Sequence, residues 1–339
     1  MSFTVRVAQF EAPVSVPVGE TILEAALAQD LAYPHGCRSG NCGACKSELL
    51  AGEVDLLPYS EFALTGAERD AGKILACRAV PWSDCAVRYL EEEDVVVHAQ
   101  RHLTTRIVAL ERVAHDVVIL RLEIVAGGPF DFTPGQYAAL RFGGLPERDF
   151  SMASLPGDPY LEFHVRCLPG GVASAYVASE ARIDEFVFVT GPFGNAYLRE
   201  AHAGPILLAG GGTGLAPVLS IARAAIAASP ARPIRLFFGA RDERDVYANG
   251  ALSALHDAGR DVRLEVVLSD PSGPTARRTG FLADALAADR ADLDGYHAYL
   301  AGPPVMVDTC TAALVARGLA KRDIHADAFF PAAAVPARP

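Results

Sequence analysis

Four cysteines in the first quarter of this 339-residue chain have a spacing that could hold a metal cluster. They are Cys37, Cys42, Cys45 and Cys77. The first three form the pattern C-x4-C-x2-C, and the fourth stands alone 32 residues later. This is the ligand spacing of plant-type [2Fe–2S] clusters. Gly40 and Gly43 allow the tight backbone turns that point amide groups at sulfur, so we expect an iron–sulfur site here.

A structural zinc site is the alternative for these thiols, because it also uses four cysteines. Zinc sites usually combine two short C-x2–4-C pairs, whereas Cys77 has no near neighbour, so the spacing favours the iron–sulfur cluster. Cys85, Cys167 and Cys310 lack any such spacing, and we expect each to be a small buried side chain. Seven cysteines is an odd number, which suits reduced thiols or metal ligation better than a disulfide framework.

Phosphate-binding residue types follow in the middle of the chain. The tetrapeptide Arg148-Asp-Phe150-Ser151 occurs by chance in many proteins, but here it precedes residues 164–166 (His-Val-Arg) and residues 170–174 (Gly-Gly-Val-Ala-Ser). A glycine pair followed by serine at the start of a helix supplies backbone N–H groups and a hydroxyl. This combination suits a pyrophosphate.

Two glycine-containing loops in the last third suit a nucleotide. Residues 210–214 (Gly-Gly-Gly-Thr-Gly) lie between a predicted strand at 206–209 and a predicted helix at 217–228, which is the context of a dinucleotide-binding loop. The loop is not a strict G-x-G-x-x-G, so a glycine-rich turn without a ligand stays open. Residues 302–306 (Gly-Pro-Pro-Val-Met) follow a predicted strand at 298–301, at the sheet edge where ligands bind.

The elements that must position these residues fall into three compositional segments, which we predict to be domains at 1–97, 100–202 and 203–335. The first contains a strand with Phe3, Val5 and Val7 on one face and a helix that Thr21 caps; acidic residues 91–94 and the segment 95–101 form a linker.

Alternating strands with Gly/Pro turns in the second segment predict a small antiparallel barrel. These strands are 105–113, 117–124, 137–142, 161–166 and 185–190. Strands and helices alternate in the third segment, as in a doubly wound α/β domain. Its strands are 206–209, 234–238, 262–268 and 298–301, and its helices 217–228, 250–258, 283–288 and 304–318. The fold class is therefore multidomain, α+β with α/β.

Composition and charge exclude several classes of protein. A chain with 51% hydrophobic residues is not disordered, collagenous or a small disulfide scaffold. Its net charge of −11 argues against nucleic acid and anionic membranes as partners. Residues 1–97 hold 7 Lys+Arg and 15 Asp+Glu, a net of −8. This acidic segment could steer a basic partner, or it could be an ordinary solvated surface.

The chain has no predicted membrane segment. Its start forms a strand rather than a signal peptide, and the most apolar stretch, residues 205–228, is interrupted by glycines, Pro217 and Arg223. We expect a soluble, cytoplasmic monomer.

In motif order the chain resembles the iron–sulfur flavoprotein reductases of the ferredoxin–NADP reductase superfamily. The resemblance covers nearly the full length and is greatest to reductase components of Rieske aromatic-ring dioxygenases of the naphthalene dioxygenase type. It implies a plant-type ferredoxin domain of β-grasp fold, an FAD-binding β-barrel and an NAD-binding domain. It also implies a [2Fe–2S] cluster, FAD and NADH as cofactors, and an NAD(P)H-dependent ferredoxin or oxygenase reductase activity.

The resemblance assigns roles residue by residue. The expected cluster ligands are Cys37, Cys42, Cys45 and Cys77. The expected FAD-binding residues are Arg148, Phe150, Ser151, Met152, His164, Val165, Arg166, Gly170, Gly171, Val172 and Ser174. The expected nicotinamide-nucleotide residues are Gly210, Gly211, Gly212, Thr213, Gly214, Gly302, Pro303 and Met306. Arg241 and Asp242 join them on their residue types after the second predicted strand. Ser151, Asp327 and Phe329 are expected beside the reacting part of the flavin, with Phe329 against its ring.

Two positions depart from the family pattern. Phe150 replaces the commoner tyrosine, which keeps ring stacking but loses a hydroxyl. Ala301 replaces a common cysteine, which alters the geometry or rate of hydride transfer without abolishing it. Arg241 favours a 2′-phosphate and Asp242 favours a ribose 2′-hydroxyl, so we expect a preference for NADH with some use of NADPH. A capping or surface role stays open for each of these two side chains.

These cofactors imply a division of labour. A hydride delivers two electrons at once and a cluster accepts one, so a flavin between them takes the pair and releases electrons singly. We expect the acceptor to be a Rieske-type ferredoxin or terminal oxygenase. A di-iron hydroxylase or a deoxysugar biosynthetic enzyme is the alternative acceptor, and a non-catalytic redox sensor is a remote one. A sodium-pump subunit would need a membrane anchor before the first domain, and none is predicted.

Overall fold

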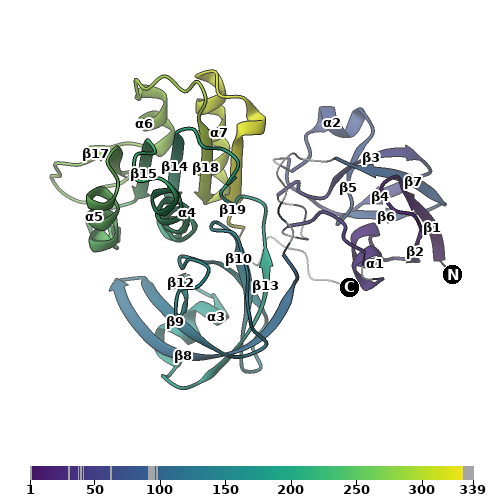
Figure 1. Ribbon diagram of the computed structural model, residues 1–339, viewed down its shortest axis with the longest axis horizontal. Coiled ribbons are helices and arrows are strands. Elements are labelled where there is room, and N and C mark those ends of the chain that lie inside the picture. Colours follow the sequence, from purple (N-terminus) through teal and green to yellow (C-terminus); the bar gives the residue numbers. More distant parts are fainter. Residues whose placement is uncertain are drawn as a thin grey trace. The chain divides into compact units, whose positions relative to one another are not determined.

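The computed structural model describes residues 2–29, 31–36, 38, 40, 42–61, 63–90, 96 and 98–330 (Figure 1). They form two compact units: one is built on residues 2–90 with 193–195, and the other on residues 98–192 with 196–329. Cys37, the acidic residues 91–94 of the predicted linker and the end of the predicted third domain after residue 330 lie outside the described residues. None of the described helices is long and apolar enough to span a membrane.

The first unit is a mixed sheet with short helices. Its elements are β1 (Ser2–Val7), β2 (Val14–Pro17), α1 (Ile22–Ala28), β3 (Lys46–Ala51), β4 (Val54–Leu56), α2 (Gly66–Asp70), β5 (Lys73–Leu75), β6 (Ala79–Pro81) and β7 (Cys85–Tyr89). The main sheet has the order β2-β1-β7-β3-β5, with β1 and β7 parallel, and β4 pairs with β6. As predicted, Thr21 caps α1 and forms a capping box with Glu24, while Val5 and Val7 face the core.

The second group of strands forms a near-closed antiparallel barrel. Its elements are β8 (Arg101–Ala114), β9 (Val117–Ala126), β10 (Tyr137–Phe142), β11 (Arg148–Ser151), β12 (Leu161–Arg166), α3 (Val172–Ser179) and β13 (Phe186–Phe193). The strand order is β11-β10-β13-β8-β9-β12. One isolated bridge, between Met152 after β11 and Phe163 of β12, links the two edges, so the sheet is nearly closed. Arg101, predicted as the last linker residue, instead begins strand β8, because it pairs with Gly191 of β13.

The third group is a six-stranded parallel sheet with helices on both faces. Its elements are β14 (Ile206–Gly211), η1 (Gly212–Gly214), α4 (Leu215–Ala228), β15 (Ile234–Ala240), η2 (Glu243–Asp245), α5 (Asn249–Ala258), β16 (Val262–Leu268), β17 (Arg278–Thr279), α6 (Leu282–Ala288), β18 (His297–Gly302), α7 (Pro304–Ala316), η3 (Lys321–Asp323) and β19 (Ile324–Ala328). The order is β17-β16-β15-β14-β18-β19. Figure 1 shows α4 and α5 on one face and α6 and α7 on the other.

This strand order reverses between β14 and β18, which makes that position the topological switch point of a doubly wound sheet. Ligands bind at such points, beyond the carboxyl ends of the strands. The register pairs Gly210 with Ala301 at this edge. The predicted glycine-rich loop therefore begins in the last two residues of β14 and continues through η1, and the predicted second loop begins at the last residue of β18. Both lie at this edge, side by side.

Glycines allow the two loops to approach backbone to backbone. A Cβ atom added at Gly214 would lie 2.0 Å from the carbonyl oxygen of Ala301, and one added at Gly210 would lie 2.9 Å from the carbonyl oxygen of Gly214. Gly302 has φ +147°, a conformation that glycine adopts most readily. The loop sequence is thus required for packing at this edge, whatever ligand it binds.

Gly214→Ala tests this close approach. Gly214 has helical φ and ψ, so the substitution strains packing rather than the backbone. We expect a loss of about 2 kcal/mol in the free energy of unfolding, typical of overpacking, measured by urea denaturation. Gly250→Ala is the matched control, because an added Cβ there has open space within a helix and should leave stability equal or slightly higher. Equal stability of the two variants would contradict the packing argument.

Three histidines stack at the other end of β18 and β19. The rings of His202 and His297 have centroids 3.7 Å apart, and His325 Nε2 lies 3.3 Å from His297 Nδ1. Burial lowers the pKa of His325 to about 3, with further lowering by Arg199 and the other two histidines. Burial also lowers the pKa of His297, although the nearby Asp323 carboxylate acts to raise it. The lowered pKa values favour neutral rings at His297 and His325, where β18 and β19 pack together.

This stack predicts acid sensitivity. The unfolded chain binds a proton at His325 near pH 6.5 and the folded chain only near pH 3, so stability is full above about pH 6.5 and falls as the pH drops toward 3. His325→Phe keeps a ring against Tyr299 without the titrating group. We expect a shallower fall in unfolding free energy between pH 6.5 and 4, with the exposed His102→Phe as control. Identical pH slopes in parent and His325→Phe would refute the assignment.

Candidate functional site

Three of the four predicted cluster ligands lie among the described residues. Cys45 and Cys77 are buried and Cys42 is half-buried. The backbone N–H of Cys77 points at the Sγ atom of Cys45, with 3.4 Å between nitrogen and sulfur. In iron–sulfur sites, backbone amide groups donate hydrogen bonds to the ligand sulfur atoms in this way.

The backbone around these thiols leaves no room for side chains at three glycines. Gly40 and Gly43 have φ of +79° and +77°, as the sequence predicts for tight turns. A Cβ atom at Gly36 would lie 2.9 Å from the Sγ atom of Cys42, and one at Gly40 would lie 2.8 Å from Tyr59 and Arg78 side-chain atoms. A compact thiol-lined turn of this kind fits an inorganic cluster.

In the second unit, the end of β11 meets the end of β19. Ser151 is buried and its hydroxyl donates a hydrogen bond to Asp327 Oδ2 over 3.3 Å, across 176 residues of sequence. Asp327 pairs with Ala301 in the sheet, and the backbone N–H of Phe329 donates to the carbonyl oxygen of Gly302. The three residues predicted beside the reacting flavin thus come from neighbouring segments at the carboxyl edge of the sheet.

The other residues of β11 face differently. Arg148 is half-buried and its guanidinium donates to the Glu147 carbonyl oxygen, while Phe150 packs against the barrel core. Met152 is fully buried, where it helps close the barrel.

The predicted pyrophosphate turn opens helix α3. Gly170 has φ +76°, and the Ser174 hydroxyl accepts from the Leu168 N–H and donates to the Gly171 carbonyl oxygen. A Cβ atom at Gly171 would lie 2.5 Å from that hydroxyl. No side chain among the described residues caps this helix, and Val172 is exposed at its start. An anion would suit the amide groups there.

His164 is buried in β12 with Val165, and it joins the barrel to the nucleotide sheet. Its Nδ1 atom lies 3.0 Å from the Tyr247 hydroxyl, which in turn donates to the carbonyl oxygen of Gly212 over 3.4 Å. Its Nε2 atom lies 3.4 Å from Glu162. Burial raises the pKa of Glu162, but hydrogen bonds from His164 and Arg121 outweigh burial and bring it to about 2. The imidazole therefore faces a carboxylate at neutral pH.

A cleft of about 230 Å³ opens at the carboxyl edge of the nucleotide sheet. Predicted residues line it from three places. They are Arg166 of the barrel, which the resemblance assigns to FAD, residues Gly211, Gly212, Pro303 and Met306 of the two loops, and Arg241 after β15. Met306 lies so close to Gly211 that an added Cβ would come within 2.4 Å of its sulfur. Gly210, Thr213, Gly214 and Gly302 are not among the lining residues; Gly210 and Gly302 end the strands β14 and β18, and Thr213 and Gly214 belong to η1. The cleft lies at the sheet edge where doubly wound folds bind dinucleotides.

The two charged residues after the second strand behave differently. Arg241 lines the cleft and pairs with Asp245 and Asp116 at 3.0 and 3.2 Å. Asp242 turns away, where its carboxylate accepts from the Ser272 hydroxyl and from the Glu243 N–H and caps η2. Of the two roles that the sequence left open for Asp242, a cap or a ribose contact, its side chain takes the cap.

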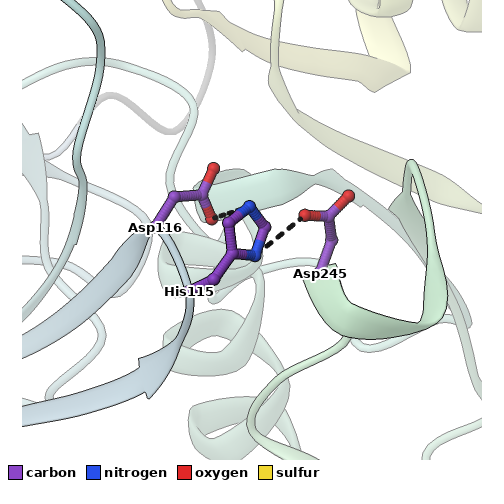
Figure 2. Close-up of side chains that lie close together, drawn as sticks. All are labelled: His115, Asp116 and Asp245. Carbon is purple, nitrogen blue, oxygen red and sulfur yellow. Dashed lines mark ion pairs between the residues drawn. The ribbon is translucent and has the colours of Figure 1, made fainter.

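Figure 2 shows His115 between Asp116 and Asp245, with ring nitrogens 3.9 and 3.5 Å from the carboxylates. Within the described part of the chain these side chains are close enough to hold a metal ion. Both carboxylates already pair with arginines, since Arg166 also reaches Asp116 over 2.9 Å. We therefore interpret the group as a charge network at the cleft.

Sequence reasoning missed several cleft residues. Asp116 is 125 residues from its partner Arg241, and no local motif marks it. Tyr247 and Phe281 also line the cleft without any spacing signal. Asp245 belongs to the charged run after the second strand, but its pairing with Arg241 is visible only in the fold.

The comparisons with known proteins agree with this geometry. Residues 5–81 match the 2Fe-2S iron-sulfur cluster binding domain, residues 104–197 the oxidoreductase FAD-binding domain and residues 208–312 the oxidoreductase NAD-binding domain. The expected three-part fold and the three cofactors are confirmed, and the cluster family replaces the zinc alternative.

Relatives match over nearly their full length. The chain is 39% identical over 323 residues to the reductase component of naphthalene 1,2-dioxygenase/salicylate 5-hydroxylase systems from Ralstonia sp, covering 94% of this chain and 96% of that protein. It is 37% identical to a naphthalene 1,2-dioxygenase reductase component from Pseudomonas putida, covering 92% and 94%. The crystal structure of an Amycolatopsis cytochrome P450 reductase is 36% identical with a TM-score of 0.80, covering 97% and 99%. The chain therefore belongs to the family of iron–sulfur, FAD-dependent ferredoxin–NAD(P)+ reductase components of oxygenase systems.

Proposed function

We propose that this reductase takes electrons from NADH through FAD and the [2Fe–2S] cluster and passes them one at a time to a Rieske-type ferredoxin or oxygenase in aromatic-ring hydroxylation. The observation that carries this proposal is the contact of Ser151 with Asp327, which joins the FAD-binding barrel to the carboxyl edge of the nucleotide sheet. We assign the domains to residues 1–97, 100–202 and 203–335.

The residues of this chain bind and orient the cofactors. Bound FAD would supply the conversion of a two-electron donor into single electrons. We assign Arg148 and the turn from Gly170 to Ser174 to its pyrophosphate, Phe150 and Phe329 to its ring system, and the cleft lined by Gly211 and Met306 to the nucleotide. Close approach of the two cofactors in a shaped site is the main requirement for hydride transfer.

Ser151 and Asp327 are proposed to hold a proton at the reacting edge. Ser151 is 8% exposed, so its hydroxyl is largely shielded from water. Its hydroxyl donates to the Asp327 carboxylate over 3.3 Å, a long hydrogen bond that favours this hydroxyl direction. Ala301 lies opposite Asp327 in the sheet and has only a methyl side chain, which cannot hold a proton. The proposed proton carriers at this position are therefore Ser151 and Asp327.

The first segment is proposed as the electron exit. It carries the cluster thiols and a net charge of −8 over residues 1–97, which would attract a basic patch on an acceptor protein. We infer a reducing, cytoplasmic setting, in keeping with the thiols of Cys45 and Cys85, and we propose that the protein is a monomer.

A cytochrome P450 is the second candidate acceptor, since the Amycolatopsis relative is a cytochrome P450 reductase. Electron transfer from the NADH-reduced protein to a Rieske ferredoxin, a di-iron hydroxylase and a cytochrome P450, each at low and high salt, separates these acceptors. The true partner should be reduced fastest, and its rate should fall as salt rises. Reduction of none of the three, with an artificial acceptor also unreduced, would refute the reductase proposal.

Cys45→Ser tests the cluster and the order of electron flow. We expect NADH to bleach the flavin of this variant anaerobically while the electron paramagnetic resonance signal of a reduced [2Fe–2S] cluster is lost. Cys167→Ser is the matched control, because Cys167 is half-exposed in the other unit and should keep the signal. A normal cluster signal in Cys45→Ser would overturn the ligand assignment.

Ser151→Ala tests the proton-holding pair. Losing a hydrogen bond to a charged group should slow flavin reduction by NADH about tenfold in stopped-flow experiments, with FAD content unchanged. Ser179→Ala is the control, since Ser179 bonds within its own helix on the exposed side of α3. An unchanged reduction rate in Ser151→Ala would remove this residue from the site.

A further inference from the structure

Asp116 reaches the nucleotide cleft from the barrel. It lies in the turn between β8 and β9, and the next residue, Val117, is buried in the core of the nucleotide sheet. This packing holds the turn at the cleft, where Asp116 Oδ2 lies 2.9 Å from Arg166 Nε and 3.2 Å from an Arg241 nitrogen. One carboxylate oxygen thus joins an arginine of the barrel to an arginine of the nucleotide sheet.

Arg241 stands where a dinucleotide ribose is read. It follows β15, the second strand of the parallel sheet in chain order, and lines the cleft. At this position an arginine accommodates a 2′-phosphate and an acidic group bonds a 2′-hydroxyl. Here the guanidinium is bonded by Asp245 through two nitrogens, at 3.0 and 3.1 Å, and by Asp116 from the other segment. The hydrogen bond to Asp245 raises the pKa of Arg241, so it stays a cation within this cluster.

The charges of the cluster balance. Arg166 and Arg241 contribute two positive charges, and Asp116 and Asp245 contribute two negative charges, with the His115 ring between the two carboxylates. A phosphate monoester carries nearly two negative charges at neutral pH and needs unpaired cationic donors. Two carboxylates beside Arg241 would repel it, whereas their oxygens can accept a hydrogen bond from a hydroxyl.

We propose that Asp116, together with Asp245, is a specificity-determining residue that neutralises Arg241 and selects a dinucleotide with a ribose 2′-hydroxyl over one with a 2′-phosphate. The inference rests on the proposed NADH-dependent function. Ser272 occupies the Asp242 carboxylate. The residue that selects the ribose is therefore Asp116, in a turn of the FAD-binding barrel, rather than Asp242.

Asp116→Asn tests the proposal through the ratio of kcat/KM for NADPH to that for NADH, with an artificial one-electron acceptor. Removing one negative charge beside the 2′-phosphate should raise this ratio about tenfold. Asp245→Asn, which keeps the Asp116–Arg166 pair, should also raise it. The double variant Asp116→Asn/Arg241→Ala should lose the gain, because the cation that binds the phosphate is gone.

Asp158→Asn is the matched control. Asp158 pairs with Arg223 over 3.0 Å, and neither residue lines the cleft, so this variant should leave the ratio unchanged. A ratio within twofold of the parent in both Asp116→Asn and Asp245→Asn, with FAD bound and NADH oxidised, would overturn the selection role alone. Failure of the parent protein to oxidise NADH would instead refute the proposed function. A rise that persists in the double variant would show that Arg241 is not the phosphate-binding group.

Discussion

The backbone contact between the ends of β14 and β18 is the constraint on which the second unit depends. The carbonyl oxygen of Ala301 occupies the space that a side chain at Gly214 would need. Because the strand order reverses here, both loops open on the same edge, and their glycines decide how closely they lie. The cleft, its lining and the approach of β19 all follow from this contact.

Polar side chains then fasten the barrel to that edge. Ser151 bonds Asp327, His164 bonds Tyr247, and Asp116 bonds Arg241; each pair joins residues more than 80 positions apart. Ser151, His164 and Tyr247 are buried, and buried polar groups are costly unless paired, so their bonds favour one relative placement of barrel and sheet over its alternatives. A fixed placement is what transfer between a nucleotide and a flavin requires.

Much of the fold could be predicted from local signals. Three of these signals act within a few residues, so the sequence displays them directly. They are the two-residue repeat of apolar side chains in β1, the capping box at Thr21, and the alternation of strands and helices after residue 204. Arg101 shows the limit of this reasoning. It looks like linker by composition, yet it extends β8 because Gly191, ninety positions away, pairs with it.

By itself, the sequence determined the cluster motif, the glycine loops and the domain order. The two motifs depend on neighbouring residues, through the spacing of thiols and the conformational freedom of glycine, and the domains follow one another along the chain. Only the tertiary structure decided what Asp242, His164 and Asp116 do. Asp242 caps a turn, His164 bonds across to Tyr247, and Asp116 neutralises an arginine of another sheet. The physical reason is that hydrogen bonds and ion pairs act over about 3 Å in space, whatever the separation in sequence.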